Sequence, residues 1–114
     1  MVDGLVFKTF NSLGVPVQRI FFDGKADTFI VFMLLGDDEP NHADDEAVSL
    51  EHQYRASIFS KDNYTELLAS ARKALKAAGF YGFTVNAEMY ESDTKYYHVS
   101  FDFNYLEVDY EDWT

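Results

Sequence analysis

The side chains best suited to chemistry in this chain are three histidines. His42 stands in an acidic segment, whereas His52 and His98 stand in alternating segments typical of strands. No two of them have the spacing that places a pair of imidazoles on one helix face toward a metal, and no cysteine can complete a thiolate site. We therefore expect structural roles for the histidines, and no metal or other cofactor.

Carboxylates offer a second route to chemistry, because paired acids can act in general acid–base catalysis. Here they occur in contiguous runs, Asp37-Asp38-Glu39 and Asp44-Asp45-Glu46. The carboxylates in such runs repel one another, which favours a solvated loop. A site for a hard cation is the alternative, although the run lacks the ligand spacing and turn glycine of a calcium loop. With no phosphate-binding glycine loop and no nucleophile-elbow serine either, we predict that the chain is not an enzyme.

The acidic residues are distributed unevenly. The chain has 9 Lys and Arg against 20 Asp and Glu, a formal net charge of -11. The segment 36–46 contains six acids and no Lys or Arg, and 104–114 contains four more: Glu107, Asp109, Glu111 and Asp112. The remainder is close to neutral. Binding to nucleic acid or to an anionic membrane requires cations, so this balance argues against both.

The length of 114 residues suits one domain. We expect a single domain over 1–106 with an acidic loop insertion at 36–49, followed by an acidic C-terminal tail at 107–114. The beginning of the chain shows no signal-peptide pattern, and the longest apolar stretch, Phe29–Leu35, is too short to span a bilayer. These features predict a soluble protein.

Periodicity predicts the elements that must position these residues. Helical spacing covers 2–13 and, after N-cap residues at 60–63, the stretch up to Gly79. Alternation predicts strands at 50–59, 81–89 and 97–105, the last two joined by a turn at 91–95. Two further strands at 17–22 and 28–35 are expected to form a hairpin across 23–27. The fold class is therefore α+β. We expect a mainly antiparallel sheet of four to five strands, two helices on one face, and the order α-β-β-β-α-β-β.

The stretch Thr28–Leu35 is apolar on both faces, which predicts a central strand or one covered by a partner subunit. Aromatic residues make up 18% of the chain and add apolar area available for an interface. The predicted interface residues are Phe29, Val31, Met33, Tyr110 and Trp113.

Several segments resemble the tail terminator, or tail-to-head joining, proteins of long-tailed phages and prophages of Gram-positive bacteria. The similarity extends over most of 14–103 and depends on the order and spacing of short motifs. They are Gly14–Val17, Thr28–Phe32, Tyr54–Tyr64, Gly79–Phe80 and, most distinctively, Tyr90–His98. The segments 36–49 and 106–114 lie outside the pattern.

The resemblance implies a structural virion protein without catalytic residues. It implies an α+β subunit that assembles into a hexameric ring at the head-proximal end of the tail, in contact with the tail tube protein and the head connector proteins. Its location would be the virion, after assembly in the host cytoplasm. Acidic segments lining the ring would repel passing DNA; they could instead contact a neighbouring subunit.

Two other classes stay open. One is an acidic DNA mimic, or another inhibitor that acts by protein interaction, for which size and charge fit but a near-neutral body does not. The other is a small enzyme or ligand-binding domain, for which the sequence shows no site.

Overall fold

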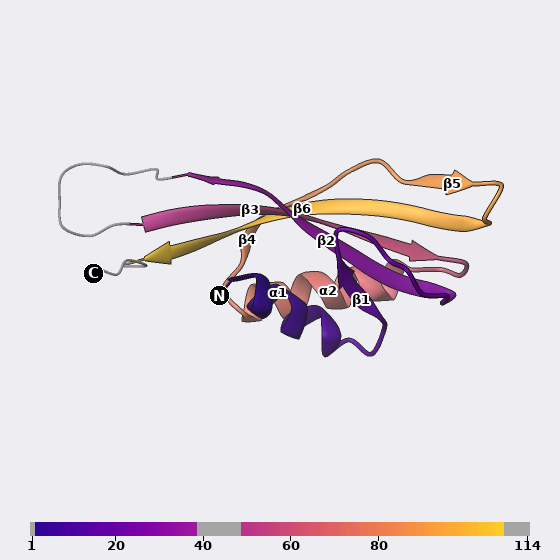
Figure 1. The fold of residues 1–114 in the computed structure, drawn as a ribbon, viewed down its shortest axis with the longest axis horizontal. Coiled ribbons are helices and arrows are strands. Elements are labelled where there is room, and N and C mark those ends of the chain that lie inside the picture. Colours follow the sequence, from indigo (N-terminus) through magenta and orange to yellow (C-terminus); the bar gives the residue numbers. More distant parts are fainter. Residues whose placement is uncertain (1, 39–48, 109–114) are drawn as a thin grey trace.

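Two helices lie against one face of a long, twisted sheet in the computed structural model, which describes residues 2–38 and 49–108 (Figure 1). The molecule measures 52 × 23 × 23 Å. Its elements in chain order are α1 (Val2–Asn11), β1 (Val17–Arg19), β2 (Thr28–Asp38), β3 (Ser49–Ser60), α2 (Thr65–Ala77), β4 (Tyr81–Val85), β5 (Met89–Glu91) and β6 (Tyr96–Val108). Neither helix is long and apolar enough to cross a membrane.

The sheet has the order β1-β2-β3-β6-β4, and β5 pairs with the beginning of β6. All pairs are antiparallel except β1 with β2. The α+β class, the mainly antiparallel sheet and the two helices on one face are thus confirmed (Figure 1). The described part of the chain has six strands, rather than four to five, because the expected strand 81–89 is interrupted after Val85 and resumes at Met89.

The predicted hairpin between 17–22 and 28–35 is wrong. The short strand β1 runs parallel to β2, with Val17 opposite Ile30. It ends where Ile20 adopts a positive φ of 77°. The side-chain amide of Gln18 then donates to Asp23 and accepts from its backbone N–H, at 3.1 and 3.3 Å. These contacts hold the returning loop beside β1, so the next strand starts in the same direction.

The two acidic segments also begin later than predicted. β2 continues through Asp38, β3 begins at Ser49, and β6 extends to Val108. Backbone pairing explains the extension, since Asp38 lies opposite Glu51 and Ser49 lies opposite Val108. We call this end of the sheet, beyond the helices, the arm: 36–38, 49–53 and 104–108 (Figure 1).

The core lies between the helices and the middle of the sheet. Phe10 of α1 is fully buried and contacts three sheet rings, Phe32, Phe101 and Phe103, with centroids 5.9 to 6.2 Å apart. The predicted alternation in β3 is confirmed, because His52, Tyr54, Ala56 and Ile58 are all buried. Full burial of a large apolar side chain contributes roughly 1.5–3 kcal/mol, so this layer fixes the body of the subunit.

Local signals fix the ends of α2. The Asn63 side chain accepts a hydrogen bond from the Thr65 N–H at 2.8 Å, which satisfies one free donor at the start of the helix. Gly79 follows the helix with φ +102°, and a Cβ there would lie 3.3 Å from the Tyr105 ring. The positive φ favours glycine at this position, and a Cβ would also crowd the Tyr105 ring.

Candidate interaction surfaces

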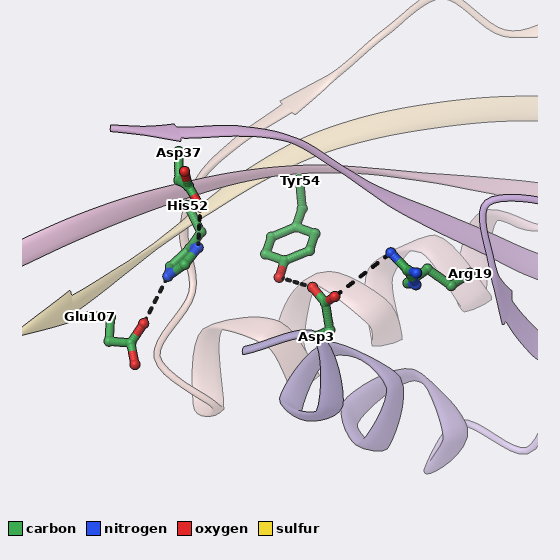
Figure 2. A network of polar contacts seen from close by, with 6 residues as sticks. All are labelled: Asp3, Arg19, Asp37, His52, Tyr54 and Glu107. Atoms are coloured by element: carbon green, nitrogen blue, oxygen red, sulfur yellow. Dashed lines mark hydrogen bonds and ion pairs between the residues drawn. The ribbon is translucent and has the colours of Figure 1, made fainter. Parts of the chain in front are cut away.

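Three strands of the arm are joined through one histidine. His52 on β3 is only 8% exposed, and its Nε2 lies 2.9 Å from a Glu107 carboxylate oxygen on β6. Its Nδ1 faces Asp37 of β2 at 3.4 Å, close enough for an ion pair but without hydrogen-bond geometry (Figure 2). We call this group the arm clasp. Because both ring nitrogens face carboxylates, the geometry suits holding strands together.

A second polar group joins the helix layer to the sheet. The Tyr54 hydroxyl donates to the Asp3 carboxylate of α1, and Arg19 of β1 lies 3.8 Å from the same carboxylate (Figure 2). Burial of Tyr54, followed by its hydrogen bond to Asp3, raises the pKa of that hydroxyl well above its ordinary value. The phenol therefore stays protonated and acts as a fixed donor.

The opposite face of the sheet carries no helix among the described residues and is apolar at one end. Ile20, Phe21 and Met33 are exposed there, Phe21 to 64%. Together with Phe22, Phe29, Val31 and Phe59 they line a depression of about 320 Å³ that also contacts Phe32, Arg55, Ser57 and His98. We call this surface the aromatic face. Exposed apolar patches of this kind mark interaction sites.

His98 is an unusual member of the aromatic face. Its ring stacks on Phe59 with centroids 4.2 Å apart, and both ring nitrogens are buried. Neither nitrogen has a hydrogen-bond partner among the described residues. A buried polar group without a partner costs roughly 1–3 kcal/mol, so the position of His98 is unfavourable for the stability of the subunit.

The predicted interface residues on β2 share this face but differ in accessibility. Met33 is 40% exposed and Val31 is half-buried. Phe29 is only 9% exposed because it stacks between Phe22 and Phe59, at 4.1 and 4.9 Å. The chain itself thus covers Phe29, which supports the face rather than contacting solvent. Tyr110 and Trp113 lie outside the described residues.

The predicted acidic loop is only partly described. Asp37 contributes to the arm clasp, and Asp38 ends β2. Glu39, Asp44, Asp45 and Glu46 lie outside the described residues, as does His42. Within the parts of the chain that the structure describes, no group of three or more His, Cys, Asp or Glu residues could hold a metal.

Sequence reasoning missed Ile20 and Phe21. Their apolar character is plain in the sequence, but their exposure follows from the positive φ of Ile20 and the parallel placement of β1, for which no local pattern exists. It also missed an ion pair at the centre of the uncovered face. Arg55 donates two hydrogen bonds to Asp102, at 2.7 and 3.0 Å, and this contact lowers the pKa of the Asp102 carboxyl.

Comparison with known proteins leaves the family open. No family model matches the chain, and no curated protein matches it. One similar solved chain belongs to the virion of a native gene transfer agent particle, with 16% identity, 90% of each chain covered and a TM-score of 0.45. Another comes from Akkermansia muciniphila, with 13% identity and a TM-score of 0.47. The alignment covers 96% of the present chain and 51% of that chain. TM-scores at this level do not assign a function.

Proposed function

We propose that this chain is a structural virion protein, a tail terminator that forms a ring at the head-proximal end of a phage tail tube. The proposal combines the sequence resemblance, strongest at Tyr90–His98, with one structural observation. That observation is the aromatic face, which leaves exposed apolar side chains and an unpartnered buried histidine on the free subunit. Such a surface is explained by a protein partner, and the proposed role is not enzymatic.

The distribution of charge supports a ring better than a DNA mimic. A mimic of DNA needs acids spread over an extended surface, as phosphates are along a duplex. Here 36–51 and 104–114 contain eleven acids and no Lys or Arg, whereas the rest of the chain has nine acids and nine Lys or Arg. The excess of acids over Lys and Arg is thus confined to two segments that include most of the arm.

The test is solution mass combined with negative-stain imaging, with and without purified tail tubes. We expect closed rings, at high concentration or on tube ends. A monomer at every concentration, with bare tube ends, would contradict the proposal. If the chain is a DNA mimic, we instead expect a one-to-one complex with a DNA-binding protein, from which added DNA displaces the chain.

The proposed role also excludes tight binding of DNA. With a formal charge of -11, the free subunit should not bind a DNA duplex measurably at physiological salt. A clear band shift under that condition would contradict both the terminator and the mimic.

A further inference from the structure

The outer side of α2 is a basic surface on an otherwise acidic protein. Arg72, Lys73 and Lys76 account for three of the nine Lys and Arg in the chain. Together with Thr65, Leu68 and Ala69 they line a shallow depression of about 430 Å³. The six residues recur at helical spacing and so form one stripe. We call it the basic stripe.

No carboxylate neutralises this stripe within the described subunit. The ion pairs among the described residues involve Arg19, His52 and Arg55, and none involves α2. Arg72 instead lies over the Phe83 ring of β4, 5.9 Å from its centroid. That contact holds the guanidinium beside β4, the last strand of the sheet, where a neighbouring molecule can approach.

The arm has the opposite charge and contains no Lys or Arg. Its acids with described side chains are Asp37, Glu51 and Glu107, on three adjacent strands, and Asp38 ends β2. Glu51 accepts a hydrogen bond from Tyr81, and Asp37 and Glu107 contact His52. The arm projects beyond the helices (Figure 1), and no ion pair among the described residues joins its acids to α2 of the same subunit.

We propose that the basic stripe of α2 is the docking surface for the acidic arm of a second copy of this chain. The inference rests on the proposed ring and identifies two of the surfaces that meet in it. A contact between two different surfaces repeats head to tail, which is the geometry that closes a ring. Opposite charges would set the orientation and speed of encounter, and half-buried Leu68 would supply apolar contact.

The first experiment reverses the charge of the stripe. The variant R72E/K73E/K76E is compared with K8E/K25E/K95E, which changes the net charge equally at exposed sites outside α2. Opposing like charges across an interface cost several kcal/mol, so we expect subunit association at least about 100-fold weaker in the first variant and close to wild type in the control. Equal behaviour of the two variants would overturn the proposal.

The second experiment exchanges the charges. The variant D37K/D38K/E51K has a basic arm, and it should not assemble alone. When it is mixed with R72E/K73E/K76E, its basic arm meets the acidic stripe of that variant, and its unchanged basic stripe meets the unchanged acidic arm. The two variants should therefore assemble together in alternation and in equal numbers. Native mass spectrometry reads the composition. Circular dichroism and thermal unfolding of each variant confirm that it is folded. Failure of two folded variants to associate would overturn the contact.

The outcomes separate this inference from the proposed function. If the wild-type chain forms no ring on tail tubes, the terminator role fails, and the arm–stripe contact is then judged by sedimentation of the mixed variants in solution. If rings form but R72E/K73E/K76E assembles normally, only the present inference fails. Loss of binding to an acidic tail protein, with normal assembly, would assign the stripe to that partner instead.

Discussion

The body of the subunit and its arm are parts of the same sheet but are stabilised in different ways. The body is held by buried rings between the helices and the sheet, with Phe10, Phe32 and Phe103 at its centre. Among the described residues the arm has no helix beneath it, and it is held by backbone pairing, by the clasp around His52 and by the contact of Tyr105 with Phe80 (Figures 1 and 2). Stability is therefore concentrated in the body, whereas the arm, with its acids, is suited to adapting to a partner.

The largest expected difference between the regions is in apolar packing. Phe10→Ala would leave a cavity among three rings, so we expect it to lower the free energy of unfolding by about 3–5 kcal/mol. On the arm, Leu106→Ala removes a side chain that is already exposed and should cost less than about 1 kcal/mol. Urea unfolding of both variants measures the two losses in the free energy of unfolding. Comparable losses would show that the arm is part of the same packed unit.

A smaller effect is expected where α1 is joined to the sheet. Tyr54→Phe removes the hydrogen bond to Asp3 while keeping the ring, so the expected loss is about 1–2 kcal/mol. The matched variant is Tyr81→Phe, which removes a hydrogen bond from an exposed hydroxyl to Glu51 at the base of the arm. It should cost under about 0.5 kcal/mol. Thermal unfolding of the pair checks this, and a larger loss for Tyr81→Phe would reverse the ranking.

The arm clasp should act locally. His52→Ala leaves the Asp37 and Glu107 carboxylates without the imidazole between them, so we expect faster amide exchange in 36–38, 49–53 and 104–108. Protection of α1 and α2 should remain as in the wild type. Hydrogen exchange followed by mass spectrometry resolves these segments. Faster exchange throughout both helices would mean that the clasp supports the whole subunit.

The smallest expected effect is a loss of folding stability at acidic pH. The pKa of Asp102 is depressed in the folded state, first by its hydrogen bond to Arg55. The carboxylate therefore makes its full contribution to the free energy of unfolding above its ordinary pKa of 3.8, and this contribution is lost as the pH falls through the lower pKa of the folded state. Because the pair is partly exposed, the contribution should be under about 1 kcal/mol. Asp102→Asn should remove that part of the pH dependence. An unchanged slope below pH 3.8 would contradict the assignment.

Elements with strong local patterns were predictable from the sequence. The alternation of β3 and β6 and the helical spacing of α2 specify which residues face the core, and burial of Tyr54, Leu75 and Phe101 confirms it. The parallel pairing of β1 was not predictable, because it depends on the φ of Ile20 and on contacts made by Gln18. Nor was the extension of strands into the acidic segments, since backbone pairing there outweighs unfavourable composition.

The surfaces were predictable only in part. Val31 and Met33, predicted as interface residues, lie on one apolar face of β2, and their role in an interface stays a prediction. Coverage of Phe29 by Phe22 was not predictable, because it depends on a loop whose return path is not encoded locally. The three cations of α2 are plain in the sequence. Their isolation from carboxylates emerges only when the arm and the helices are placed in space.

The pairing of β3 with β6 has a consequence for the time course of folding. The central ladder joins residues as far apart in the chain as Ser49 and Val108, with α2, β4 and β5 between them. Helix α2 can form within microseconds from local contacts, whereas the ladder must wait until the whole intervening segment has closed, which sets milliseconds to seconds. During that interval β3 has an unpaired edge open to other newly made chains. Production of the subunit is therefore expected to be sensitive to the rate of synthesis and to chaperones, even though the finished fold is well packed.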